Sequence, residues 1–224
     1  MPARFQVIAG RIGIAVFFLG FFALIGWLTQ IDVFKEGVPG FTAMKPNSAL
    51  CLVCLGISLS AQSLNPAQNI LLYSARLCAG LAAAIALLSF SESLFRIDLA
   101  IEQLFFRDFN GLSDGSSLIS SPGRMPPAVA FAVFLAGGSL FFLDSGSAII
   151  RFFVQVFSVI CSVIGLLVLL GYIYGIKDLF EVAAFSSIAL PAAVALFILG
   201  VGTLAARPDR CYLTDSSSQT AIAV

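Results

Sequence analysis

Residues 41–59, FTAMKPNSALCLVCLGISL, place a lysine, a proline and an asparagine directly before a run of residues without charge. Proline is tolerated in the first turn of a helix, where its missing N–H would be unpaired anyway, and Asn or Ser beside it can cap the exposed amides. The segment KPNS therefore predicts the start of an apolar helix. From the sequence, Asn47 has two alternative roles, helix capping and contact with a ligand.

The composition indicates that this helix lies in a membrane. Of the 224 residues, 59% are hydrophobic and 11% are charged, with a mean hydropathy of +1.03, whereas an ordinary soluble domain is about 45 to 50% apolar and about 25% charged. A bilayer core about 30 Å thick needs roughly 20 mostly apolar residues per helix. Runs of about that length recur along the chain. Because they are continuously apolar rather than alternating, they predict helices and not a β-barrel.

We therefore expect an all-α integral membrane protein with six transmembrane helices. The predicted spans are about 7–29, 47–63, 70–91, 126–143, 149–174 and 188–206. The short connections 64–69 and 144–148 are rich in turn residues and must lie on one side of the membrane. The longer connections lie on the other side, at 30–46, 92–125 and 175–187. The six helices then form three hairpins whose open ends face the same way.

The positive-inside rule does not decide the orientation by itself. With both termini in the cytoplasm, the inner basic residues are Arg4, Arg11, Arg76, Arg151, Arg207 and Arg210, and the outer ones are Lys35, Lys45, Arg96, Arg107, Arg124 and Lys177. The inner set consists of arginines close to span ends, whereas the outer set shares its loops with nine acidic residues. This difference favours cytoplasmic termini.

A recurring frame relates the second helices of the three hairpins. A large apolar residue, an alanine and a glycine stand at offsets 0, 5 and 12 in three places: Met44, Ala49 and Gly56; Met125, Ala130 and Gly137; Ile188, Ala193 and Gly200. The frame predicts three repeats, at about 7–63, 70–143 and 149–206. Since small residues let helices approach closely in lipid, we expect Gly56, Gly137 and Gly200 at helix contacts.

Three acidic residues occupy matching positions where the first helix of each hairpin ends. They lie in the phrases QIDVF at 30–34, RIDLA at 96–100 and IKDLF at 176–180, as Asp32, Asp98 and Asp178. If the three hairpins converge at the outer surface, these carboxylates form a ligand or signal site. Solvation of three separate helix ends is the alternative interpretation.

Aromatic residues are also concentrated toward the outer side. Trp27, Tyr172 and Tyr174 fit an interfacial aromatic belt, with the lining of a pocket as the alternative. The connection 92–125 begins ESLFRIDLAIEQLFFRDF, where Phe, Leu and Ile alternate with charges. This composition predicts a helix lying in the membrane interface. A lid over a pocket between the hairpins is the alternative.

The residue inventory gives no catalytic centre. The chain contains no histidine, which removes a phosphoacceptor histidine, a histidine general base and imidazole ligation. It has no phosphate-binding loop followed by lysine and no nucleophile elbow. Cys51 and Cys54 form a CxxC inside a span, without a second pair to complete a metal set. We interpret them as packing residues, with redox or metal sensing as the alternative. We expect no enzyme activity, metal or cofactor.

Several phrases together resemble a known family. They are MKPNSALCLVCLGISL, RMPPAVAFAVFLAGGSL, RIDLAIEQLFF, LLGYIYGIKDLF and ALPAAVALFILGVGTLAARPDR. Over about residues 11–210 they are similar to the multi-span, MASE-like sensor region of bacterial sensor histidine kinases and diguanylate cyclases. The resemblance implies a sensory input module at 1–210 in the bacterial inner membrane, a homodimer, and a kinase or cyclase partner. It also implies an output segment formed by Arg207, Pro208, Asp209 and Arg210.

The chain departs from this family in two respects. Family members continue far beyond the arginine-proline-aspartate-arginine motif, whereas residues 211–224 form a short cytoplasmic tail with no room for an effector domain. We expect a truncated product, an excised module or a stand-alone relative that signals through a partner. In addition, Ala128 and Pro191 stand where the first repeat has Asn47.

The function expected from the sequence is a non-catalytic sensory input module in contact with the lipid bilayer, with no nucleic-acid partner. Two alternatives belong to other classes. One is a small carrier or channel for an uncharged lipophilic solute, and the other is a structural membrane subunit that holds a partner.

Overall fold

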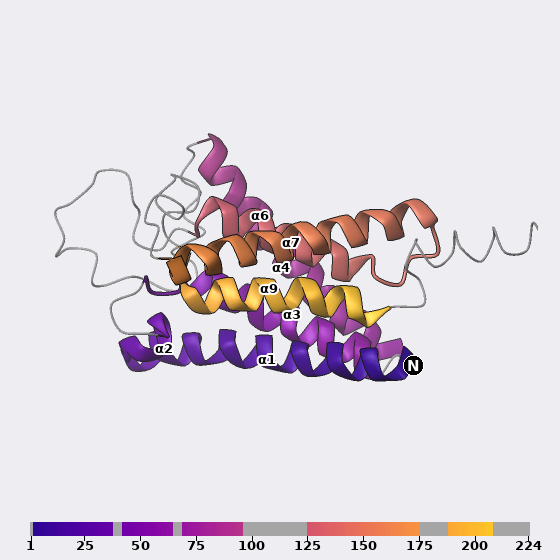
Figure 1. Ribbon diagram of the computed structural model, residues 1–224, viewed down its shortest axis with the longest axis horizontal. Coiled ribbons are helices and arrows are strands. Elements are labelled where there is room, and N and C mark those ends of the chain that lie inside the picture. The colour runs from indigo at the N-terminus through magenta and orange to yellow at the C-terminus, as the bar shows by residue number, and fades with distance from the viewer. Residues whose placement is uncertain (1, 38–41, 65–68, 96–124, 175–187, 208–224) are drawn as a thin grey trace, which may run out of the picture.

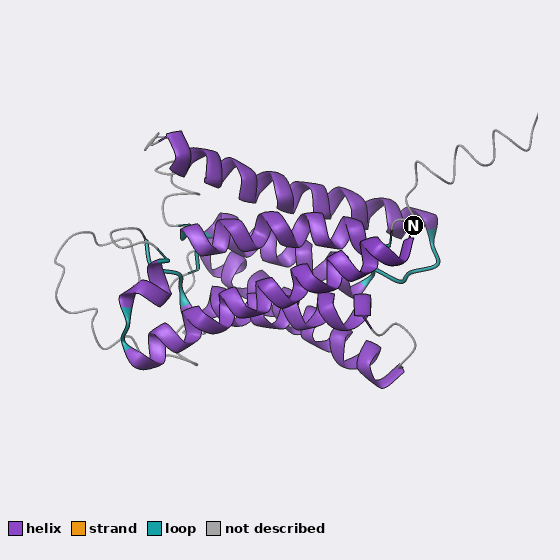
Figure 2. Ribbon diagram, turned by 60° about the horizontal axis from the view of Figure 1, so that its bottom comes forward, coloured by secondary structure: helices purple, strands orange, loops and turns teal. Residues whose placement is uncertain are grey.

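The computed structural model describes residues 2–37, 42–64, 69–95, 125–174 and 188–207. Within these ranges the chain is helical and contains no strand (Figure 2). The helices are α1 (Pro2–Thr29), the short α2 (Asp32–Glu36), α3 (Pro46–Leu64), α4 (Asn69–Phe95), α6 (Pro127–Phe141), α7 (Ala148–Tyr174) and α9 (Leu190–Ala206). The connection predicted at 92–125 begins later than expected, because residues 92–95 still belong to α4. Its residues 96–124, the tail, and the site candidates Asp98, Asp178, Pro208, Asp209 and Arg210 lie outside the described residues.

Four of these helices, α1, α3, α4 and α7, are long and apolar enough to cross a membrane. This agrees with the expected class, an all-α membrane protein. The other two apolar helices are shorter, with 15 residues in α6 and 17 in α9. At 1.5 Å per residue, α6 is roughly 22 Å long, less than the bilayer core of about 30 Å. The six predicted spans therefore remain a prediction for α6 and α9.

The prolines of the recurring frame determine where the two short helices begin. Pro127 is the first residue of α6 and Pro191 lies in the first turn of α9, positions where a missing N–H removes no helical hydrogen bond. The residues just before them, Met125 and Ile188, are not helical, yet they are 0% and 2% exposed. Helices α6 and α9 are thus each preceded by a buried, non-helical entrance.

The three second helices form the centre of the bundle. The helices α3, α6 and α9 contact one another, and each first helix lies between two of them. Helix α1 packs against α3 and α9, α4 packs against α3 and α6, and α7 packs against α6 and α9. The buried share of the most apolar window is 61% for α3 but 28%, 22% and 28% for α1, α4 and α7. The first helices therefore present most of their surface to the outside.

Small residues form the inward face of the outer helices. In α4 the buried positions are Ala75, Ala79, Ala82, Ala86, Ser89 and Glu92, and in α7 they are Val154, Ser158, Cys161, Gly165, Val168 and Gly171. Steps of three and four residues keep one stripe of a helix against its neighbours, as in left-handed helix packing. The opposite faces carry exposed apolar side chains, such as Ile70, Leu77 and Leu81 on α4, which is the surface that lipid would cover.

The start of α1 and the end of α9 lie at the same end of the bundle (Figure 1). The turn between α6 and α7, residues 142–147, lies at this end as well. We call it the arginine end, because the described basic residues in this half of the bundle are Arg4, Arg11, Arg76, Arg151 and Arg207. The opposite end, which we call the mouth, holds α2 and the starts of α3, α6 and α9.

Candidate functional site

A charged cluster joins the helices at the arginine end. The Nε of Arg207, the residue after α9, donates a hydrogen bond to Oδ1 of Asp144 in the α6–α7 turn at 2.9 Å. The other carboxylate oxygen of Asp144 lies 3.7 Å from a terminal nitrogen of Arg76 on α4. The side chains of Arg207 and Asp144 are only 13% and 17% exposed, so their charges interact with little screening by solvent.

Two backbone carbonyls accept further hydrogen bonds from the Arg207 guanidinium group. Its two terminal nitrogens donate to the carbonyls of Gln62, near the end of α3, at 3.2 Å and of Ala206 at 3.0 Å. The side chain of Gln62 donates from Nε2 to the carbonyl of Leu140 on α6 at 3.1 Å. We call Arg76, Asp144, Arg207 and the Gln62 carbonyl the Asp144 cluster. It links α3, α4, the α6–α7 turn and the end of α9, and therefore all three predicted hairpins.

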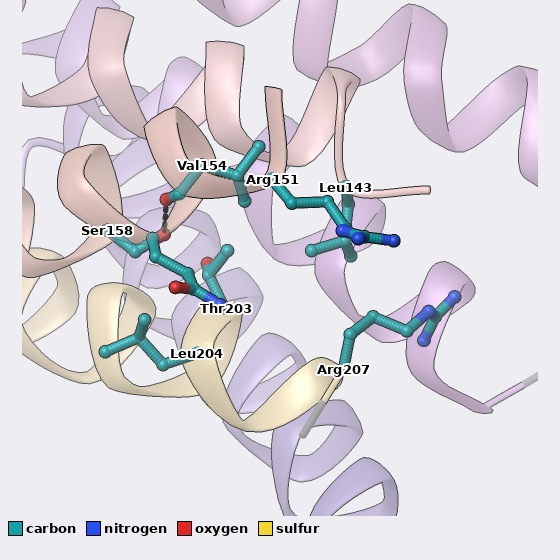
Figure 3. A pocket seen from close by; sticks show the side chains of 8 residues that line it. Leu143, Arg151, Val154, Ser158, Thr203, Leu204 and Arg207 are labelled. Carbon is teal, nitrogen blue, oxygen red and sulfur yellow. Dashed lines mark hydrogen bonds between the residues drawn. The ribbon is translucent and has the colours of Figure 1, made fainter. Parts of the chain in front are cut away.

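A cavity of about 230 Å³ lies beside this cluster, between α7 and α9 (Figure 3). Its polar lining includes Arg151, Ser158 and Thr203, and Arg207 belongs both to the cavity and to the Asp144 cluster. The hydroxyls of Ser158 and Thr203 donate to the carbonyls one turn earlier in their own helices. The two guanidinium groups therefore dominate the electrostatics of the cavity.

A second cavity, of about 450 Å³, lies next to α4 and the end of α6. It is lined by Tyr73, Arg76, Leu77, Phe141, Phe142, Asp144 and Ser145. The Nε of Arg76 is buried and makes no hydrogen bond within the described part of the chain. Each of the two cavities thus has an arginine of the Asp144 cluster in its wall, Arg207 in the first and Arg76 in the second.

Asn47, a ligand candidate from the sequence, is buried at the mouth. It is 3% exposed, and its Nδ2 finds no hydrogen-bond acceptor among the described residues. The starts of α3, α6 and α9 meet close by, where Ser48, Val129 and Ala192 line one contact region. That region has no space for a water molecule. Among the described residues, the three helix starts therefore meet in a closely packed contact region.

The structure places one of the three predicted acidic residues. Asp32 lies at the start of α2 and pairs with Lys35 at 2.7 Å, and the ammonium of Lys35 also lies 5.1 Å from the centre of the Trp27 ring. The Asp32 side chain is 73% exposed, so this pair is a solvated one within a short helix. Convergence of Asp32 with its two counterparts remains a prediction.

The three frame glycines lie where helices touch. A Cβ on Gly56 would lie 2.5 Å from the Phe17 nitrogen of α1, one on Gly137 would lie 2.8 Å from the Ala79 oxygen of α4, and one on Gly200 would lie 2.6 Å from the Ser158 oxygen of α7. Real Cβ atoms do not approach backbone atoms this closely. In all three places the second helix of a predicted hairpin approaches the backbone of the first.

Two aromatic residues make matching hydrogen bonds at the mouth. The Trp27 indole N–H donates to the Met44 carbonyl at 2.8 Å, and the Tyr172 hydroxyl donates to the Ile188 carbonyl at 2.7 Å. Both acceptors are the first residue of the recurring frame, just before a second helix. The sequence predicted these aromatics as interfacial anchors or pocket walls, and it did not indicate this bonding role. Tyr174 is 72% exposed.

The described cysteines form no disulfide with one another. Cys51, Cys54, Cys78 and Cys161 are all free thiols. Cys51 and Cys161 are fully buried, with their sulfurs 3.9 Å and 3.5 Å from the carbonyls of Ala82 and Leu196 on neighbouring helices. Within the described ranges, no group of three or more Cys, Asp or Glu side chains could hold a metal ion.

Sequence reasoning identified Arg207 but missed its partner. Asp144 was assigned only to a tight turn, and Gln62 to the interior of a span. The sequence did contain one indication of this ion pair. Among the described residues at the arginine end, Asp144 is the one acidic residue, and the other charged residues there are arginines. Comparison of the chain with protein-family models, with curated proteins and with solved structures gives no match.

Proposed function

We propose that this chain is a non-catalytic, membrane-embedded sensory input module of a bacterial signalling protein of the sensor kinase or cyclase type. In this proposal six helices span the inner membrane as three hairpin repeats, both termini are cytoplasmic, and the effector is a kinase or cyclase. The arginine end is then the cytoplasmic end, as expected when arginines gather near span ends on that side.

Recurring contacts support the three-hairpin arrangement. The pairs α1 with α3, α4 with α6, and α7 with α9 make the most extensive contacts in the bundle. Each pair has a glycine at the twelfth offset of the frame against the backbone of its partner helix. The first and third pairs also share the hydrogen bond from an aromatic side chain to the carbonyl at offset zero.

Buried entrances support a membrane crossing by the two short helices. Met125 and Ile188 precede α6 and α9 as non-helical, buried residues. Non-helical backbone is tolerated at membrane depth where protein covers it. Together with such entrances, 15 and 17 helical residues can reach across a bilayer that adapts to them by a few ångströms.

The observation that carries the proposal is the position of Arg207 in the Asp144 cluster. Arg207 is the first residue after the last described helix, so it lies where an output segment would leave the membrane. Its contacts to Asp144 and to the Gln62 carbonyl fix that exit relative to the other hairpins. A stimulus that repacks the hairpins would change these contacts and move the exit. The shift can be no larger than the difference in free energy with which the stimulus binds the two packings.

A fusion assay tests the proposal. Residues 1–210 are joined to the catalytic domain of a diguanylate cyclase, and product is measured in membranes while lipid composition, redox state and small ligands are varied. We expect output that depends on at least one of these conditions. Flat output from a correctly inserted fusion would contradict the sensory role and favour the carrier or the partner-holding subunit.

A crosslink between α1 and α9 sharpens the assay. A Cβ on Gly202 would lie 3.2 Å from the Cβ of Ile12, close to the roughly 3.5 to 4.5 Å of a disulfide. The double variant Ile12→Cys, Gly202→Cys should therefore oxidise readily and hold α9 in place. We expect oxidation to abolish the response and reductant to restore it, with each single variant as the control. A response that persists in the oxidised double variant would exclude movement of α9 as the output.

A further inference from the structure

The contact between α3 and α4 has a register that two sets of interactions define. The end of α3 and the start of α4 both contribute to the Asp144 cluster, through Gln62 and Arg76, so the two helices run in opposite directions. Within their contact, Sγ of Cys51 on α3 lies 3.9 Å from the carbonyl oxygen of Ala82 on α4. Residues one turn further along α3 therefore face residues one turn earlier on α4.

This register places Cys54 of α3 opposite Cys78 of α4. Cys54 follows Cys51 by three residues and Cys78 precedes Ala82 by four, which correspond to rises of about 4.5 Å and about 6 Å toward the arginine end. Steps of three and four residues also keep to one face of a helix, so both thiols stay at the contact. They lie close enough for a charge on one to act on the other. The two cysteines thus form a pair across neighbouring helices.

Both thiols of this pair lie at the outer edge of the contact. Cys54 and Cys78 are partly exposed, whereas Cys51 is fully buried with its sulfur against α4. Beside Cys78, Leu77 and Leu81 are 65% and 59% exposed and belong to the outer face of α4. A molecule dissolved among lipid chains can therefore reach the pair without entering the core of the bundle.

The position of the pair along the helices favours an apolar reactant. Helices α3 and α4 are both long and apolar enough to cross a membrane. Cys54 lies about 12 Å from the first residue of α3, and Cys78 lies about 14 Å from the first residue of α4, at 1.5 Å per residue. In a bilayer core about 30 Å thick, both thiols are then far from either aqueous surface. A reactant must be soluble in the membrane to reach them.

We propose that Cys54 and Cys78 are a redox-active pair, which a membrane-soluble quinone oxidises to a disulfide. Two S–H bonds break and one S–S bond forms, and the two electrons and two protons pass to the quinone, which leaves as a quinol. A quinone suits this position because it is apolar and accepts electrons and protons together. The disulfide joins α3 to α4, and therefore the first predicted hairpin to the second. The inference concerns the thiol pair alone and holds whether or not the chain is a sensor.

The reaction can be followed on the full chain in liposomes. Cys211, which lies outside the described residues, is changed to serine to prevent links between copies. The reduced protein is treated without oxygen with a short-chain ubiquinone analogue, the remaining thiols are alkylated, and the protein is digested without reductant. We expect the loss of two alkylated thiols per chain, the reduction of one quinone per chain, and a peptide pair joined through Cys54 and Cys78.

Single variants and a second oxidant separate this pair from the other cysteines. Cys54→Ser and Cys78→Ser should each abolish the loss of thiols and the reduction of quinone. The matched controls Cys51→Ser and Cys161→Ser remove fully buried thiols and should leave the reaction unchanged. Ferricyanide, which is charged and soluble in water, should oxidise the pair much more slowly than the quinone does. Circular dichroism of each variant shows whether the helices are intact.

Three results would overturn the proposal. If all thiols of the chain remain free after treatment with the quinone, the pair is not redox-active. A disulfide between Cys51 and Cys54, or one between two copies of the chain, would assign the chemistry to different thiols. Equal rates with ferricyanide and the quinone would show that the oxidant arrives from water. None of these readouts depends on a signalling output, so they are independent of the fusion assay.

Discussion

The Asp144 cluster allows a quantitative prediction, because one carboxylate faces two arginines in different settings. Its distances to Arg207 and Arg76 are 2.9 Å and 3.7 Å. Coulomb's law alone makes the second interaction weaker by only about a fifth. The hydrogen bond and the exposure differ far more. Arg207 donates within the usual range of about 2.7 to 3.2 Å and is 13% exposed, whereas Arg76 lies beyond that range and is 35% exposed.

We therefore expect very unequal coupling free energies in double-mutant cycles. The cycle of Asp144→Asn with Arg207→Gln should give about 1.5 to 3 kcal/mol, the value of a hydrogen bond between charged groups. The cycle of Asp144→Asn with Arg76→Gln should give less than about 1 kcal/mol, as for a partly exposed ion pair. The free energy of unfolding is measured in mixed detergent and dodecyl sulfate micelles for each single and double variant.

The cycle with Arg11→Gln serves as the control, because this exposed arginine has no contact with Asp144 in the structure. It should give a coupling of zero within error. Equal coupling for Arg76 and Arg207, or a coupling with Arg207 below about 0.5 kcal/mol, would refute the assignment of Arg207 as the main partner of Asp144.

Two further predictions use neighbouring residues as controls. Gly137→Ala should destabilise the fold by about 1 to 3 kcal/mol, because the new Cβ would lie 2.8 Å from the Ala79 oxygen. At the control position Gly138, a Cβ would have no atom within 4 Å. Gly138→Ala should therefore be neutral or stabilise the fold by about 1 kcal/mol. Equal thermal shifts for the two variants would contradict the close packing of α4 and α6. Tyr172→Phe should cost about 1 to 3 kcal/mol, because it leaves a buried carbonyl at the start of α9 without a donor. Tyr174→Phe changes a residue that is 72% exposed and should not affect stability. If Tyr174→Phe lowered the denaturation midpoint as much as Tyr172→Phe does, the Tyr172 hydrogen bond would be excluded as the cause.

The helices of this protein could be predicted from the sequence because charge and turn residues mark their ends. The span predicted at 149–174 begins one residue after the start of the helix Ala148–Tyr174, because the turn residues at 144–148 immediately precede the mostly apolar run. The span predicted at 126–143 begins one residue before α6 and ends two residues after it, and the span predicted at 188–206 begins two residues before α9. Hydrophobicity does not distinguish a buried non-helical entrance such as Ile188 from the helix that follows it.

The site was harder to predict, because its partners are distant in the chain. Arg207 and Asp144 are separated by 63 positions, and Arg207 and Gln62 by 145. No periodicity within one helix links such residues, and only the ring of contacts among α3, α6 and α9 brings them together. The same holds for Trp27 and Tyr172, whose acceptors are backbone carbonyls and leave no trace in the pattern of side chains.

The contact between α1 and α9 has a consequence for how the protein is made. Gly202 of α9 lies against Ile12 of α1 and Leu59 of α3, so the first helix acquires one of its two neighbours only when the last described helix has left the ribosome. Domains generally form from the N-terminus during synthesis, but this bundle cannot close in that order. Until then the inward stripe of α1 faces lipid or an insertion factor. We expect ribosome-arrested chains that end before residue 190 to be sensitive to protease at α1, and longer chains to be protected.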